Sequence, residues 1–261
     1  MSSPRLFACT AACLALVSFS GCQSTGSPQA FAKLAPETGG MPSHAEVTAA
    51  LQQVVSGSNG GFGLDMWATV VDRSGVVVMV TRSGATPGDQ WPGSRVISAQ
   101  KANTANAFSL PGLALSTANL FTAVQPGQSL FGLQASNPVD TRVAYSGAAI
   151  DFGTADDPMV GGRIGGVNVF GGGLPLYNAS GRLIGGLGVS GDSSVADHII
   201  AWKLRDALGL DHIPGGVSPT GDDNMVLDFV GDMSPSGWGH AATTSEATQI
   251  VDDLPESHPV K

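Results

Sequence analysis

Hydrophobic residues recur along this chain with two different periods, and each period predicts its own kind of element. Val47, Leu51 and Val54 are spaced at i, i+4 and i+7, which is the spacing of one helix face. Just before them, Ser43 and Glu46 form an S-x-x-E capping box. We therefore expect a helix that begins at this point.

Two β-hairpins are predicted further along the chain. The stretch "MWATVVDRSGVVVMVTRSG" holds two β-branched runs around a tight "DRSG" connection, and "LPLYNASGRLIGGLGVS" repeats this plan around "NASG". A helical pattern follows each hairpin, at "SRVISAQKANTANAF" and from about Ser194. The predicted order is therefore helix, hairpin, helix, long excursion, hairpin, helix.

The excursion and the end of the chain are predicted to be mostly irregular. "STANLFTAVQPGQSLFGLQASNP" indicates a short helix and a turn, and the acidic, glycine-rich "DFGTADDPMVGGRIGG" indicates a surface loop. Residues 214–261 carry turn residues, scattered acids and few periodic apolar positions. We expect them to form an extension that packs on the domain or trails from it.

Three glycines in the second hairpin resemble a cofactor fingerprint. Gly186, Gly188 and Gly191 spell G-x-G-x-x-G between an apolar run and a helical pattern, as in dinucleotide-binding folds. Those folds require a parallel β-α-β unit, whereas these glycines belong to the second arm of a predicted antiparallel hairpin. The pattern therefore argues against an NAD or FAD site.

The first residues are typical of a targeting segment. Arg5 precedes the apolar stretch "LFACTAACLALVSFS", and "SGC" resembles a bacterial lipobox whose cysteine, Cys22, is lipidated. Phe19 departs from the leucine usual in that motif, which leaves an ordinary secretory signal or a retained anchor as alternatives. We expect a signal peptide over residues 1–21, a linker over 22–42, and an exported protein anchored to the membrane through its lipid alone, otherwise periplasmic or secreted.

Composition and motifs exclude several classes of function. All three cysteines lie within the first 22 residues, so the body of the chain holds no disulfide and no cysteine nucleophile. The net charge is -9 and the 12 basic residues do not cluster, which argues against a nucleic-acid partner. The chain contains no H-E-x-x-H, nucleophile elbow or P-loop, so no motif names a reaction.

Lys101 is the most informative single residue. It shares a helix face with Ile97, Thr104 and Phe108, which places an ammonium group in the middle of a predicted buried stripe. Burying that charge without a partner is costly. Lys101 therefore either reaches past the helix rim, forms a structural ion pair, or points into a pocket that binds an anionic ligand.

His198 lies in the first turn of the last predicted helix, beside Trp202 at i, i+4. That helix has one apolar stripe through Ile200 and Leu204 and a second, narrower one through Val195, Ile199 and Trp202. The second stripe suggests another packing partner, either the C-terminal extension or another subunit. His198 is a candidate iron ligand or pocket residue, and the alternative is a half-exposed histidine near a helix start.

Other candidate positions are less specific. The stretch "VFGGGLP" suits either an anion-binding nest of backbone N–H groups or a tight turn into a strand. Asp192 or Ser193 is expected to cap the last helix, and Asp197 suits its positive end. His212 and His240 are isolated and are expected at the surface.

Five stretches in this order resemble the GlcG/HbpS family, which includes haem-binding HbpS-like proteins, GlcG and the C-terminal domain of PduO. They are "ATVVDRSGVVVMVTRSGA", "SRVISAQKANTANAF", "TAVQPGQSLFGLQ", "FGGGLPLY" and "GRLIGGLGVSGDSSVADHIIAWK". The resemblance implies a single α+β domain over residues 43–213, in which two hairpins form an antiparallel sheet with helices packed on it. Residues 138–166 would be an inserted loop and residues 214–261 an extension, as in a larger, exported subgroup.

The resemblance also implies a function and a set of site residues. We expect a homo-oligomeric protein that binds haem or another small anionic ligand for storage, scavenging or sensing. The alternatives are an enzyme or accessory protein acting on a small hydroxy or keto acid, and an interaction protein whose oligomer is the working unit. The candidate iron ligand is His198, and the full candidate binding set is Lys101, Phe170, Gly171, Gly172, Gly173, Ser190, Asp192 and His198.

Overall fold

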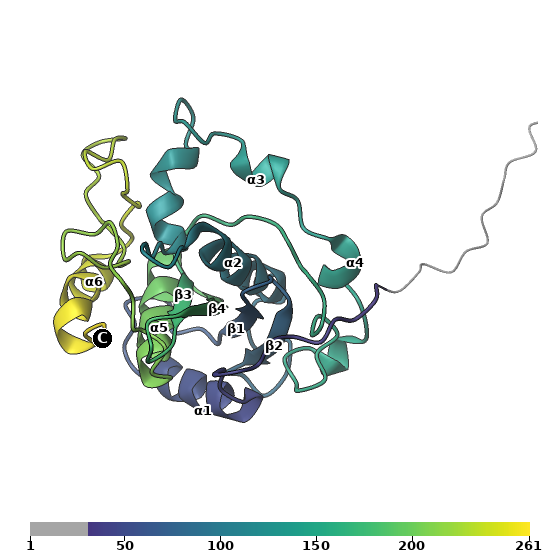
Figure 1. The fold of residues 1–261 in the computed structure, drawn as a ribbon. Helices are drawn as coiled ribbons and strands as arrows, with labels where there is room; N and C mark the ends of the chain where they lie inside the picture. Colours follow the sequence, from purple (N-terminus) through teal and green to yellow (C-terminus); the bar gives the residue numbers. More distant parts are fainter. Residues whose placement is uncertain (1–30) are drawn as a thin grey trace, which may run out of the picture.

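A four-stranded antiparallel sheet lies between two layers of helices in this protein, for which a computed structural model describes residues 31–261 (Figure 1). The strands are arranged in the order β2-β1-β4-β3, so the two hairpins meet through their long inner strands. Their bounds are β1 (Trp67–Asp72), β2 (Val77–Arg82), β3 (Gly173–Tyr177) and β4 (Leu183–Ser190). The expected α+β class with two hairpins is confirmed.

Helices cover both faces of the sheet. The helix α2 packs on one face against β1, β3 and β4, while α1 and α5 lie together on the other, and α6 packs against α5. The α-helices are α1 (His44–Val55), α2 (Ser94–Phe108), α3 (Leu133–Ser136), α4 (Thr141–Ala144), α5 (Ser194–Ala207) and α6 (Ser245–Ser257). Short 3-10 turns occur at Thr117–Leu120, Thr122–Val124 and Ala149–Asp151.

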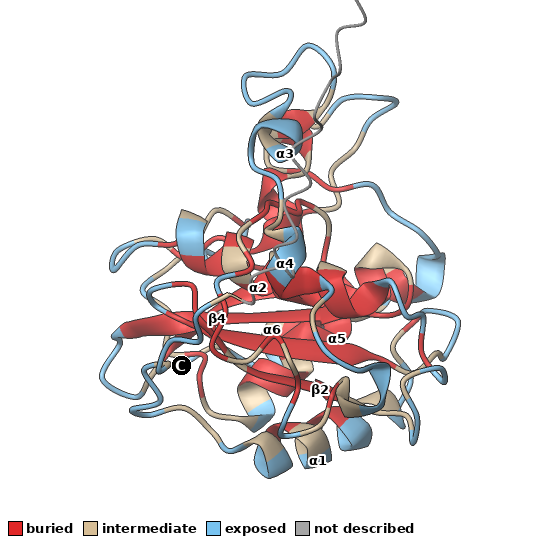
Figure 2. Cartoon of the chain, turned by 90° about the vertical axis from the view of Figure 1, so that its right-hand side faces the viewer, coloured by how far each residue is buried: buried red, intermediate tan, exposed pale blue. Residues whose placement is uncertain are grey.

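Strands β1, β3 and β4 are buried along their whole length because both of their faces are covered, and the edge strand β2 is buried except at two half-buried positions (Figure 2). Alternate side chains of β4, such as Leu187 and Val189, face the core beneath α1 and α5. Gly186 and Gly188 face α2, where a methyl group would overlap the carbonyl oxygens of Ala102 and Ser98. Two of the three glycines that resemble a cofactor fingerprint therefore let a helix backbone approach a strand.

Local signals in the sequence are confirmed where they depend on near neighbours. Ser43 and Glu46 form the expected capping box of α1. The Asp72 carboxylate accepts hydrogen bonds from the N–H groups of Ser74 and Val76 in the first hairpin turn. Ser193 is the residue whose side chain caps α5, by accepting a hydrogen bond from the N–H of Ala196.

The stretch 151–166 is more than the expected surface loop. Met159 and Ile164 are fully buried and pack with Trp67 and with residues of β2 and α2. Asp157, also buried, forms an ion pair with Arg95 of α2. The few apolar residues of the stretch 151–166 have no periodic spacing, which explains why the sequence pattern does not reveal its contacts with the core.

Residues 214–261 pack on the domain, the first of the two arrangements expected for them. No helix is predicted here from the sequence, and the structure corrects that expectation with α6, whose Ala247, Val251 and Leu254 are buried in the core with Trp202. Their i, i+4, i+7 spacing is a helical signal, although Pro255 and the surrounding acids obscure it. The second apolar stripe of α5 is thus covered by the C-terminal extension.

Some parts of the sequence prediction lie outside the described residues. The signal peptide, Cys22 and most of the linker fall within residues 1–30. Between residues 31 and 261, no helix combines the length and the apolar character needed to cross a bilayer.

Candidate functional site

The ammonium group of Lys101 is fully buried and forms an ion pair with Asp197. Its Nζ donates to Asp197 Oδ2 at 2.6 Å and to the carbonyl oxygen of Val189 at 3.0 Å, and it lies 4.7 Å from the centre of the Phe170 ring. These contacts satisfy the charge from within the chain. Of the alternatives left open by the sequence, the structure thus supports the ion pair, and Lys101 is not free to meet an anionic ligand.

Asp197 links the lysine to the turn that precedes α5. Its Oδ1 accepts hydrogen bonds from the N–H groups of Gly191 at 3.1 Å and Asp192 at 2.9 Å. Burial raises the pKa of the Asp197 carboxyl to about 6 although Lys101 opposes the shift, and burial lowers the pKa of Lys101. The pair holds the end of β4, this turn and α2 together.

The glycine-rich loop before β3 is built for close contact. Gly172 has φ +114°, and a side chain there would come within 3.0 Å of Lys101 Nζ. The N–H of Gly173 donates to Thr117 Oγ1 at 2.9 Å, and that hydroxyl donates to the Phe170 carbonyl oxygen at 2.7 Å. Because the Gly173 N–H is already bonded within the chain, this loop fits the strand-entry turn better than an anion nest.

Two of the candidate residues lie beside this group, at the end of β4 and in the turn that follows it. Ser190 ends β4 opposite Trp67 of β1. The Asp192 carboxylate accepts hydrogen bonds from the N–H groups of Phe62 and Leu64, so it anchors the loop before β1. It also lines a surface cavity of about 220 Å³, which is smaller than the roughly 300–1,000 Å³ of ligand pockets.

His198 is fully buried, which rules out the half-exposed alternative. Its Nε2 lies 3.2 Å from Asn224 Oδ1 and 3.1 Å from the N–H of Met225, both in the C-terminal extension. Its Nδ1 has no hydrogen-bond partner within residues 31–261. Burial lowers the pKa of His198 to about 3, so the ring is neutral at pH 7.

His240 belongs to the same region, contrary to its expected place at the surface. Only 2% of the residue is exposed, its ring centroid lies 4.5 Å from that of Phe121, and its Nε2 is 3.3 Å from Ser194 Oγ at the start of α5. Burial lowers its pKa to about 4. A lone histidine in "GWGH" has no periodic neighbours, so the sequence holds no signal of this burial.

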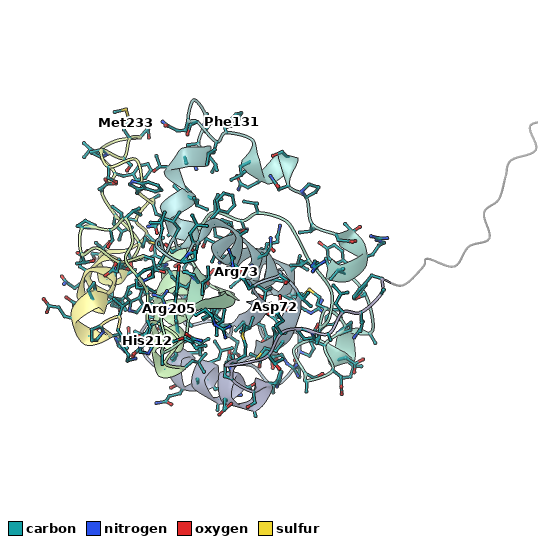
Figure 3. All side chains as sticks on the ribbon, in the orientation of Figure 1. Asp72, Arg73, Phe131, Arg205, His212 and Met233 are labelled. Carbon is teal, nitrogen blue, oxygen red and sulfur yellow. The ribbon has the colours of Figure 1, made fainter. Side chains whose placement is uncertain are left out.

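A second buried ion pair fastens the extension to the domain. Arg205 of α5 donates to both oxygens of Asp223 at 2.6 and 2.7 Å, and to the carbonyl oxygen of Pro175 at 3.2 Å. Figure 3 shows Arg205 on the side of α5 that faces the C-terminal segment. The only sequence signal for this contact is a charged residue in the apolar surface of α5.

Within residues 31–261 no three His, Cys, Asp or Glu side chains gather closely enough to hold a bare metal ion. The Lys101 ion pair, the half-buried Phe170 ring and the neutral rings of His198 and His240 instead lie around the start of α5. Lys101 contacts Phe170, the neighbouring Gly171 packs against His198, and His240 contacts Ser194. We call this group, with Phe121, the α5 site. The α5 site suits an aromatic ligand that is uncharged, or whose charge is delocalised, better than a small anion.

Comparison with solved structures finds several shorter proteins that align with part of this chain. Among them are the Klebsiella pneumoniae protein ORFY (25% identity, TM-score 0.44, covering 64% of this chain and 90% of that one) and a PduOC–haem complex (25%, 0.45, 67% and 95%). A third is HbpS (20%, 0.41, 64% and 90%).

Comparison by sequence gives a clearer result. No protein of curated function matches significantly. The family model described as "Haem degrading protein HbpS-like" matches residues 43–205, which contain Lys101, Phe170 and His198 and make up well over half of the chain. The chain therefore belongs to the HbpS-like family.

Proposed function

We propose that this protein binds haem at the α5 site. The observation that carries the proposal is the family match, because the matched residues include the ion pair, the Phe170 loop and most of α5. The haem complex of a family neighbour is in keeping with it. When bound, haem supplies an iron that takes a protein side chain as axial ligand.

The residues of the α5 site fit such a ligand chemically. Phe170 and Phe121 are half-buried aromatic side chains, packed against Lys101 and His240 respectively, and supply apolar surface for a flat macrocycle. His198 and His240 are neutral at pH 7, which is the form that ligates iron. Lys101, neutralised by Asp197, holds Phe170 in place by its contact with the ring.

Access to the α5 site requires movement of the segment that covers it. His198 is buried beneath Asn224 and Met225. His240 belongs to the covering segment and is buried against Phe121 and Ser194. The tip of that segment is exposed, with Val230 at 73% and Met233 at 71%, and so has few contacts that resist opening. We therefore propose that the ligand enters at this end of the molecule, where the loops of Met233 and Phe131 both lie at the top of Figure 3.

Titration of the purified full-length protein with haemin tests the proposal. We expect a saturable shift of the Soret band at one haem per chain, weakened by Phe170→Ala. Phe62→Ala is the matched control, because that ring is 74% exposed and lies in the loop before β1. An unshifted spectrum at micromolar haem would refute haem binding.

The geometry does not favour the alternative of a small hydroxy or keto acid. Asp197 already provides the carboxylate that Lys101 binds. A thermal-shift panel of such acids beside haemin compares the two functions directly. Stabilisation by an acid and not by haemin would favour the alternative.

Export, lipid anchoring and self-association are further parts of the proposal. The sequence of residues 5–22 supports a lipid on Cys22, and metabolic labelling with a fatty acid that Cys22→Ala abolishes would test it. Exposed apolar residues such as Leu110, Tyr145 and Ile150 support association of copies. Light scattering that gives a monomer mass would count against that association.

A further inference from the structure

We infer that the iron ligand at the α5 site is Nε2 of His240, delivered by the C-terminal extension, and not a nitrogen of His198. This inference rests on the proposed haem binding. His240 lies beyond residues 43–205, so it belongs to the part of this chain that the family model does not match.

The hydrogen bonds of His240 leave Nε2 unprotonated, so that this nitrogen is able to bind iron. Its Nδ1 lies 2.7 Å from the carbonyl oxygen of Ala241. A carbonyl oxygen only accepts, so Nδ1 carries the proton, and in the neutral ring Nε2 holds a lone pair. Histidines that ligate metals commonly donate their other N–H to a backbone carbonyl or carboxylate, which fixes the tautomer and the orientation of the ring.

The surroundings of His240 Nε2 are suited to a flat apolar ligand. Among the residues that the structure describes, its one polar contact is the hydroxyl of Ser194 at 3.3 Å, which is a long distance for a hydrogen bond to a hydroxyl. Phe121 packs on the imidazole at 4.5 Å between centroids, and Phe229 meets the edge of Phe121 at 6.1 Å. Iron would replace one weak hydrogen bond in an aromatic environment.

The nitrogens of His198 are placed less favourably. Nε2 is engaged by Asn224 and by the N–H of Met225, and the Asn224 side chain also donates to the carbonyl oxygen of Val251 in α6. Nδ1 lacks a hydrogen-bond partner within residues 31–261 but has no exposed surface. Ligation through His198 would therefore detach residues 224–225 from the core. The neighbouring Arg205–Asp223 ion pair opposes this movement, because it holds the chain in place at residue 223.

His240 is attached to the domain through contacts that open more easily. Its own N–H donates to the carbonyl oxygen of Val226 at 2.8 Å, within the same loop, and Thr122 Oγ1 donates to the Gly239 carbonyl oxygen at 2.6 Å. Opening of residues 226–240 exposes both His240 and Phe121 while the buried Arg205–Asp223 pair stays closed. The loop that covers the α5 site thus also carries its ligand.

Haemin titration of single-histidine variants tests the inference. We expect His240→Ala to weaken haemin binding more than about tenfold and to shift the Soret maximum, and added imidazole to restore the original spectrum. The control His212→Ala should keep the wild-type spectrum and affinity, because His212 follows the opposite end of α5. His198→Ala removes a residue of the α5 site and should lower the affinity for haemin, but at saturating haemin it should keep the wild-type Soret maximum, because the iron ligand is unchanged. His240→Gln serves as a second variant if His240→Ala does not fold.

The outcomes separate the inference from the proposed function. If the wild-type protein binds no haemin, both are overturned. If it binds haemin, but His240→Ala and His240→Gln keep the wild-type spectrum or His198→Ala loses it, only the assignment of His240 is overturned. Circular dichroism of each variant shows whether a lost spectrum reflects lost folding.

Discussion

Acidification should destabilise the ligand-free protein through its two buried histidines, and one substitution should remove half of this effect. Burial lowers the pKa of His198 to about 3 and that of His240 to about 4, from an ordinary value of 6.5. The unfolded chain therefore binds protons below pH 6.5 that the folded chain does not. The stability that the folded protein has with both histidines neutral is complete above pH 6.5, and it is lost as the pH falls toward their folded-state pKa values of about 4 and about 3.

The size of the effect follows from the distance to the ordinary pKa. Each pH unit below 6.5 lowers the free energy of unfolding by about 1.4 kcal/mol per histidine. At pH 5 each histidine therefore lowers it by about 2 kcal/mol, and the two together by about 4 kcal/mol. Asp197 acts in the opposite direction, because its pKa is raised to about 6 and the folded state gains a proton first. Because Asp197 is present in both proteins, its contribution cancels when the wild type is compared with His240→Gln.

Urea unfolding at pH 7 and pH 5 measures this difference. We expect the wild type to lose about 2 kcal/mol more than His240→Gln between the two pH values. His212→Gln, a change in a half-buried histidine at the other end of α5, should behave as the wild type. Equal losses in wild type and His240→Gln, or an imidazole resonance of His240 that titrates near pH 6.5, would refute the reasoning.

Three other substitutions test the packing around the α5 site. Gly188→Ala should cost about 3 kcal/mol or more in urea unfolding, because its methyl group overlaps the backbone of α2; an unchanged midpoint would contradict that contact. Asp197→Asn should cost about 3–5 kcal/mol by leaving the charge of Lys101 buried and unpaired, and a double change with Lys101→Met should recover part of that loss. Arg205→Met should leave Asp223 unpaired at a similar cost of about 3–5 kcal/mol and make the extension sensitive to limited proteolysis after residue 214. Resistance to proteolysis equal to that of the wild type would argue against the Arg205–Asp223 ion pair as the anchor of the extension.

Patterns between near neighbours carry most of the predicted architecture. The capping box of α1, the two hairpin turns and the spacing of apolar residues in α2 and α5 are interactions over a few residues, and the structure confirms them. The burial of Lys101 follows from the same helix periodicity. The extension shows the limit of this approach, because a single helix with a proline near its end does not stand out from the surrounding turn residues.

Periodicity and turn chemistry within short segments are enough to predict both hairpins, the helices α1, α2 and α5 and the buried lysine. What Lys101 binds depends on the tertiary fold, since Asp197 lies 96 residues away and meets it only when α2 and α5 pack near the end of β4. The same holds for His240, which enters the α5 site because the Arg205–Asp223 ion pair and α6 fold the extension back over the domain. Contacts between distant segments depend on how the layers close, and no local pattern in this chain specifies that closure.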